Sequence, residues 1–151
     1  MTINPYQDIH TSILAYCKNF LTRHSITGFQ VFDYDAHAVT QQLPIDKHLI
    51  GVSDYSIENQ TDMYEITCVI AVCTLSTDND LKILYDTMGK LFAELRPGAS
   101  GERFAILDSG GVKRGYLTVH DNVMAMPVGR TDTRPFQGIA VSFGAGYLEL
   151  P

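Results

Sequence analysis

The stretch MYEITCVIAVCTL, residues 63–75, constrains the fold more than any other part of the chain. It is rich in β-branched residues and lies between polar segments, as is typical of a β-strand. Successive side chains of a strand point to opposite faces, and one face here is apolar or aromatic throughout: Tyr64, Ile66, Cys68, Ile70 and Val72. The other face begins polar and turns apolar at Val69 and Ala71. We therefore predict a strand covered on one face along its length and on both faces near its end.

A capped amphipathic helix is predicted near the start of the chain. Asn4 is the expected N-cap and Pro5 the first helical residue, and Gln7 completes a variant of the capping box. The apolar residues that follow recur at intervals of three and four and form one stripe: Ile9, Ile13, Tyr16, Cys17, Phe20 and Leu21. We expect this helix to end before Gly28.

A second helix is predicted after the central strand. In STDND, residues 76–80, one of Ser76, Thr77 and Asp78 is the expected cap, with acidic residues in the first turn. Its expected apolar stripe consists of Leu81, Leu84, Tyr85, Met88, Leu91, Phe92 and Leu95. The RPG sequence at 96–98 should end the helix.

The remaining segments indicate strands and turns. FQVFDYD (29–35) and HLIGVSDYSIE (48–58) precede the central strand, and RFAILD, KRGYLTVHD and NVMAMPV follow the second helix. Two long polar connections, residues 36–47 and 121–134, separate some of these strands. Helices separated by runs of strands favour an α+β fold with a mixed, mainly antiparallel β-sheet and the two main helices packed on one face. The length suits a single domain, residues 1–151.

Charge and cysteine content limit the function classes. The net charge of −6 argues against sequence-independent DNA binding, which needs clustered cations, but suits a surface along which DNA slides. Three cysteines without regular spacing fit a reducing compartment. The sequence has neither an evident signal peptide nor an apolar run long enough to cross a bilayer, so we expect a soluble intracellular protein with no membrane contact.

The sequence AVSFG, residues 140–144, differs by one residue from the nucleophile elbow of α/β-hydrolases. That motif needs a helix after the serine and a histidine later in the chain, whereas the chain ends seven residues after Gly144 and the last histidine is His120. The neighbouring glycines also lack the helix and lysine of a phosphate-binding loop. We therefore interpret Ser142 as a strand residue.

Other candidate catalytic groups favour structural roles. Cys17 lies on the apolar stripe of the first helix, and Cys68 and Cys73 should face opposite sides of one strand. Asp108 and the pair His120–Asp121 lie at expected hairpin ends, where such residues favour turns. The histidines lack metal-ligand spacing. We predict no catalytic residues, no cofactor and no metal, although a site made of distant residues stays open.

Six basic residues are spread through the second half of the chain, and the last two are candidates for contact with an anion or a partner: Arg96, Arg103, Lys113, Arg114, Arg130 and Arg134. Arg130 and Arg134 flank TDT before the last strand, where partner contact and a solvated loop are equally good interpretations. The predicted interface consists of Arg130, Arg134, Phe136, Tyr147 and Leu148. We interpret FQGIAVSF (136–143) as a strand, whose glycines mark bends or close approaches, and GAGYLELP (144–151) as an extension that reaches a neighbouring subunit.

The order of these elements resembles the tail-terminator (tail-completion, neck) proteins of tailed bacteriophages. The resemblance covers nearly the whole chain: the helix NPYQDIHTSILAYCKNFL, the strand MYEITCVIAVCTL, the helix STDNDLKILYDTMGKLFAEL, a late hairpin and the final RPFQGIAVSFGAGYLEL. It implies a virion protein, assembled in the host cytoplasm, that forms a homo-hexameric ring on the tail tube. The ring would stop tube polymerisation, offer a docking surface to the head connector, and let DNA pass through its lumen without sequence-specific binding.

Two other readings remain open at the level of the sequence. One is a different phage component, such as a neck, head-closure or tail-tube protein. The other is a small α+β enzyme or ligand-binding domain whose site is made of dispersed residues. The family that the chain resembles has no catalytic residues, so the resemblance implies a non-enzymatic protein.

Overall fold

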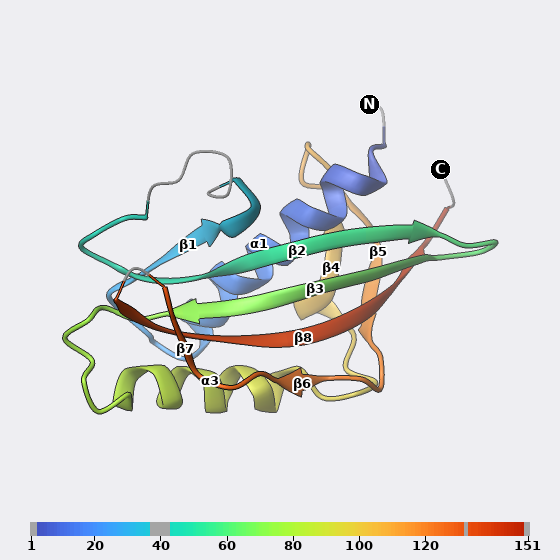
Figure 1. Ribbon diagram of the computed structural model, residues 1–151. Helices are drawn as coiled ribbons and strands as arrows, with labels where there is room; N and C mark the ends of the chain where they lie inside the picture. The colour runs from blue at the N-terminus through green and yellow to red at the C-terminus, as the bar shows by residue number, and fades with distance from the viewer. Residues whose placement is uncertain (1–2, 37–42, 132, 150–151) are drawn as a thin grey trace.

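The structure, a computed structural model, describes residues 3–36, 43–131 and 133–149. Its helices α1 (Pro5–Arg23) and α3 (Lys82–Glu94) cover one face of a mixed, mainly antiparallel sheet (Figure 1). The strands are β1 (Phe29–Asp33), β2 (His48–Asn59), β3 (Tyr64–Cys73), β4 (Ala105–Leu107), β5 (Lys113–Val119), β6 (Met124–Ala125), β7 (Gly129–Thr131) and β8 (Arg134–Tyr147). A short 3₁₀ helix, Glu102–Phe104, precedes β4. The α+β prediction is confirmed.

The sheet is organised around three long neighbouring strands. Its order is β1-β2-β3-β8-β5-β4, with β6 and β7 also paired to β8. Among the strands of the described residues, only β1 and β2 pair in parallel. The hairpin that joins β2 to β3 projects beyond the rest of the sheet (Figure 1). The pairing between these two strands shifts between Ser53 and Ser56, where Asp54 has a φ of 53°.

The predicted start of the first helix is confirmed. The Asn4 side chain accepts a hydrogen bond from the Gln7 backbone N–H at 3.2 Å and donates one to the Gln7 side chain at 3.3 Å. Pro5 is the first helical residue. All six residues of the predicted stripe are buried, and α1 packs by that stripe against β1, β2 and β4.

The predicted start of the second helix is wrong. The helix begins at Lys82, and Leu81, with a φ of 60°, stands at the N-cap without a side-chain cap. Asp78 nevertheless accepts hydrogen bonds from the backbone N–H groups of Ile83 at 3.1 Å and Leu84 at 3.0 Å. Asp78 therefore satisfies first-turn amides from outside the helix, because the left-handed Leu81 turns the chain back toward it.

The predicted stripe of α3 is only partly buried. Leu84, Met88, Leu91 and Leu95 lie in the core, whereas Tyr85 is 54% exposed and Phe92 is 44% exposed. The cause is the narrow contact of α3 with the sheet, which involves chiefly β3 and β8. The side chains on one side of α3 fill that contact. The two aromatic residues directly follow Leu84 and Leu91 in the chain, so they point away from the contact and remain exposed to solvent.

The central strand has the predicted faces. Ile66, Cys68, Ile70 and Val72 belong to the large core beneath the helices. Ala71 and Cys73 belong to a second, smaller cluster on the opposite face, together with Tyr34 and Leu49. Strand β3 is therefore covered on both faces only near its end, as its sequence predicts.

The final segment differs from its prediction. Strand β8 continues to Tyr147, and Gly144 pairs with Glu65 of β3 and with Thr118 of β5. The interpretation of 144–151 as an extension beyond the strand is thus wrong for Gly144–Tyr147, because these residues pair with β5, and Gly144 and Ala145 pair with β3 as well. A Cβ at Gly144 would lie 2.6 Å from Nε2 of His120, so glycine here allows close approach of side chains. Residues 150 and 151, and residues 37–42 of the predicted polar connection 36–47, lie outside the described residues.

Candidate functional site

Ser142 lies in the middle of β8. It pairs with Thr67 of β3, and its carbonyl oxygen accepts a hydrogen bond from the His120 backbone N–H at 2.9 Å. The chain is extended on both sides of the serine, without the sharp turn into a helix that a nucleophile elbow requires. The interpretation of AVSFG as a strand is confirmed.

The three cysteines are buried in two different clusters. Cys17 and Cys68 lie in the large core and Cys73 in the smaller one, so Cys68 and Cys73 face opposite sides of β3 as predicted. Burial raises the pKa of the Cys17 thiol to about 12. A thiol nucleophile acts as its thiolate, so this environment suppresses the reactivity of Cys17.

Asp108 closes the turn between β4 and β5. Its carboxylate accepts hydrogen bonds from the backbone N–H groups of Gly110 at 2.9 Å and Val112 at 3.0 Å, and from Arg114 Nε at 2.8 Å. The bond from Val112 contributes most to holding the pKa of Asp108 below its ordinary value. His120 pairs with Glu65 on β3 at 2.9 Å, rather than with Asp121. Asp108 therefore has the turn role expected from the sequence, whereas the contact between His120 and Glu65 was not predicted.

Arg134 holds two loops in place at one end of the sheet; we call this place the Arg134 corner. Its guanidinium donates hydrogen bonds to the carbonyl oxygens of Thr74 at 3.2 Å, Pro44 at 2.5 Å and Lys47 at 2.5 Å. The residue is only 7% exposed. Arg134 is therefore engaged inside its own chain, which corrects both interpretations of it, as a solvated loop residue and as a surface contact.

The other predicted interface residues lie in different surroundings. Phe136 is half-buried against Tyr34 in the smaller cluster, and Tyr147 packs edge-on against Tyr64 with ring centroids 5.7 Å apart. Arg130 is exposed, and Leu148 is 67% exposed. The structure does not bring these residues together as one patch, and their role in an interface stays a prediction.

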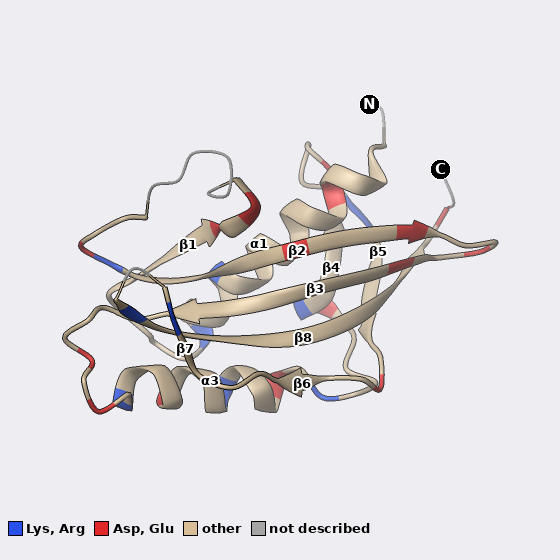
Figure 2. Ribbon diagram, in the orientation of Figure 1, with Lys and Arg blue, Asp and Glu red and all other residues tan. Residues whose placement is uncertain are grey.

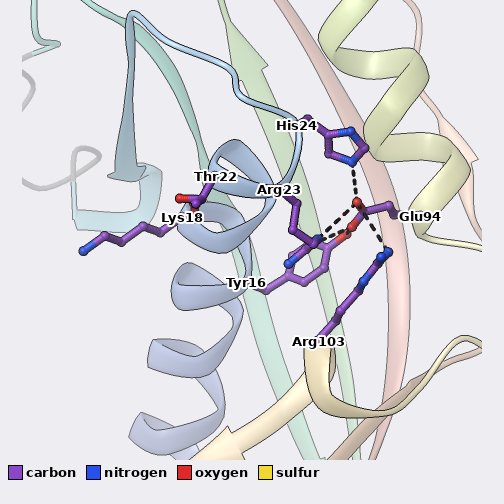
Figure 3. A network of polar contacts seen from close by, with 7 residues as sticks. All are labelled: Tyr16, Lys18, Thr22, Arg23, His24, Glu94 and Arg103. Atoms are coloured by element: carbon purple, nitrogen blue, oxygen red, sulfur yellow. Dashed lines mark hydrogen bonds and ion pairs between the residues drawn. The ribbon is translucent and has the colours of Figure 1, made fainter.

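A network of charged side chains joins the C-terminal ends of the two helices (Figure 3). Glu94, the last residue of α3, accepts hydrogen bonds from Tyr16 at 2.8 Å and Arg23 at 2.6 Å, and contacts the His24 ring. Arg103 approaches the same carboxylate to 3.5 Å from the 3₁₀ helix. Figure 3 shows these side chains converging on Glu94 from two segments, the C-terminal part of α1 and the 3₁₀ helix.

The Glu94 side chain is only 7% exposed, yet it is ionised in this setting. Burial raises the pKa of its carboxyl, but the hydrogen bonds from Arg23, His24 and Tyr16 outweigh burial and leave the pKa below its ordinary value. Burial also raises the pKa of Tyr16, and the neighbouring Glu94 carboxylate raises it further. The network therefore consists of a neutral phenol and cations around one carboxylate.

An open hollow of about 640 Å³ lies over this network. Besides Arg23, His24, Glu94 and Arg103, its lining includes Lys90 and Arg96, both of which are exposed. Within the part of the chain that the structure describes, neither Lys90 nor Arg96 forms an ion pair. We call this feature the basic hollow, since three arginines and one lysine line it beside a single carboxylate.

The sequence gave Arg96 and Arg103 no particular role and did not predict the basic hollow. Its residues come from the end of α1, the last turns of α3 and the segment before β4. One signal was present: Arg23 and Arg96 stand at helix ends, where cations complement the helix dipole. Joining those ends required the packing of α1 and α3 on the same face of the sheet.

His10, Asp33 and Asp35 form another polar cluster that the sequence did not reveal. One ligand atom of each lies within 4.8 Å of the others, beside Tyr55. The carboxylates already have backbone partners: Asp35 accepts from the N–H groups of Asp54 at 2.9 Å and Tyr55 at 3.2 Å. These bonds stabilise β2 where its pairing with β3 shifts, between Ser53 and Ser56. The cluster therefore has a structural role.

The comparisons with known proteins do not assign the chain to a family. No protein-family model matches the chain, and no curated protein matches it. Among the helices of the described residues, none is sufficiently long and apolar to span a membrane.

Proposed function

We propose that this protein is a structural virion component that caps the tail tube of a bacteriophage as a ring. In this role it ends polymerisation of the tube and presents a docking surface to the head connector. It contributes no catalysis and no cofactor. DNA passes through the lumen of the ring, and the protein resides in the tail or neck of the virion.

The observation that carries the proposal is the projecting hairpin between β2 and β3 (Figure 1). Residues 58–62 are all exposed, and β1 pairs only with residues 48–52 of β2. The β2 edge from Ser56 to Asn59 therefore has pairing to β3 on one side only, among the described residues. An exposed strand edge on a projecting element is a template for contact with another chain.

Two further features support an assembly role. Tyr85 and Phe92 expose aromatic surface on the outer side of α3, and aromatic residues are enriched at protein interfaces. The net charge of −6 disfavours adhesion of the DNA that a neck ring must let pass.

The proposal is tested by adding the purified protein to tube protein from the same phage during polymerisation. We expect shorter tubes of uniform length, each with a ring at one end in negative-stain images. A strictly monomeric protein that neither binds tubes nor limits their length would contradict the proposal. Self-polymerisation into tubes would identify a tube protein instead, and binding only to the head connector would identify a head-closure protein.

A further inference from the structure

We propose that the basic hollow of one copy receives the acidic β2–β3 hairpin of the next copy in the ring. This inference rests on the proposed ring function and names the two surfaces that meet. It commits to a second copy of this chain as the occupant of the hollow.

The first argument is the unbalanced charge of the basic hollow. Glu94 accepts contacts from Arg23, His24 and Arg103, so its single negative charge is already shared. Lys90 and Arg96 add two exposed cations on the same rim. In a chain with a net charge of −6, this local excess of positive charge marks a surface for an acidic partner.

The second argument is the opposite charge of the hairpin. Glu58 and Asp62 are exposed near its tip, and residues 56–66 contain no lysine or arginine. Neither carboxylate forms an ion pair within the described residues, whereas Glu65 is paired with His120. Figure 2 shows acidic residues, and no basic ones, along this projecting element. Its charge therefore complements that of the hollow.

The third argument is the separation of the two surfaces on one chain. The hairpin projects from the end of the sheet (Figure 1), whereas the hollow is lined by residues at the C-terminal ends of α1 and α3. A copy cannot place its own hairpin in its own hollow. A contact between two different surfaces of identical copies is head to tail, and such a contact closes into a ring when the rotation allows it.

Charge reversal tests the inference. The hollow variant carries Lys90→Glu and Arg96→Glu, and the hairpin variant carries Glu58→Lys and Asp62→Lys. Each should weaken ring formation at least tenfold, measured by sedimentation velocity in the presence of tail tubes. Combining all four substitutions in one chain restores opposite charges and should recover most of the ring. Lys82→Glu is the matched control, because Lys82 lies at the other end of α3 and pairs with Asp86.

The outcomes separate this inference from the function on which it rests. Rings that persist in both charge-reversed variants, with circular dichroism unchanged, would overturn the inference and leave the ring function standing. A wild-type chain that forms no ring with tubes would overturn the proposed function itself. If the hollow variant forms normal rings but loses affinity for inorganic phosphate or for a DNA duplex, the hollow binds that anion and the inference is wrong.

Discussion

The Arg134 corner and the basic hollow use the same kind of side chain in opposite ways. Arg134 is buried and donates to three backbone carbonyl oxygens of its own chain. In the hollow, several cations share one carboxylate, and Lys90 and Arg96 have no ion-pair partner among the described residues.

The difference shows how to distinguish cationic side chains that stabilise the folded chain from those that are available to a partner. A guanidinium that donates to several carbonyl groups of its own chain stabilises the folded state, and removing it leaves those groups without this partner. An exposed cation without a partner contributes little to stability. Substitutions at the two places should therefore affect different measurements.

The largest effect is expected at the Arg134 corner. Arg134→Gln should lower the free energy of unfolding by about 3 kcal/mol, because the buried carbonyl group of Thr74 and the part-buried ones of Pro44 and Lys47 lose a charged donor. Urea denaturation measures the change. Arg130→Gln, an exposed arginine of the same connection, is the matched control and should change stability by less than about 0.5 kcal/mol. If the two substitutions lowered the free energy of unfolding equally, the internal hydrogen bonds of Arg134 would not be the cause of its effect.

Glu94 should have a smaller, pH-dependent effect. Glu94→Gln should cost about 1.5 kcal/mol at pH 7, because the charged partners of the carboxylate remain in place. Since the folded-state pKa of Glu94 lies below its ordinary value of 4.5, its contribution is complete above that value and is lost as the pH falls through the folded-state pKa. The difference between wild type and variant should thus shrink from pH 7 to pH 3 in denaturation experiments. A difference that stays constant over this range would show that ionisation of Glu94 is not the cause.

A substitution at Gly89 should raise the free energy of unfolding instead of lowering it. It lies within α3 at the hollow, and a Cβ there would meet no atom within 4 Å. Gly89→Ala should therefore raise the free energy of unfolding by about 0.5–1 kcal/mol through helix propensity. Thermal unfolding measures the gain. A loss of stability would mean that the hollow is more crowded than its geometry indicates.

The smallest stability effect is expected for the unpaired cations of the hollow. Lys90→Gln combined with Arg96→Gln should change the free energy of unfolding by less than about 0.5 kcal/mol. The same substitutions should weaken assembly in sedimentation experiments. If this pair destabilised the monomer as strongly as Arg134→Gln, the two regions would not differ in the way described.

Much of the fold was predictable because its signals are local. The Asn4 cap, the stripe of α1 and the two faces of β3 depend on neighbouring residues in the chain, and all three predictions are confirmed. The start of α3 was not predictable in this way. Asp78 does cap the helix, but a left-handed Leu81 separates the cap from the first turn, and leucine carries no signal for that conformation.

Tertiary packing decided the features that the sequence did not reveal. Tyr85 and Phe92 belong to the apolar stripe of α3, but the narrow contact between helix and sheet leaves both exposed. Arg134 looked like a loop residue, and only the approach of Pro44 and Lys47 makes it an internal anchor. The basic hollow needs three segments at one place, so none of its residues could identify it alone.

The most direct measurement tests whether the hairpin of one copy lies in the hollow of the next. A variant with Asp62→Cys and Lys90→Cys is assembled on tail tubes, oxidised, and separated on a non-reducing gel; the native cysteines are buried, with exposures of 0%, 4% and 0%. We predict a ladder of disulfide-linked oligomers that ends at the size of the closed ring. The control with Asp62→Cys and Lys82→Cys should give no ladder. Rings that yield only monomers after oxidation of the first variant would contradict the head-to-tail contact.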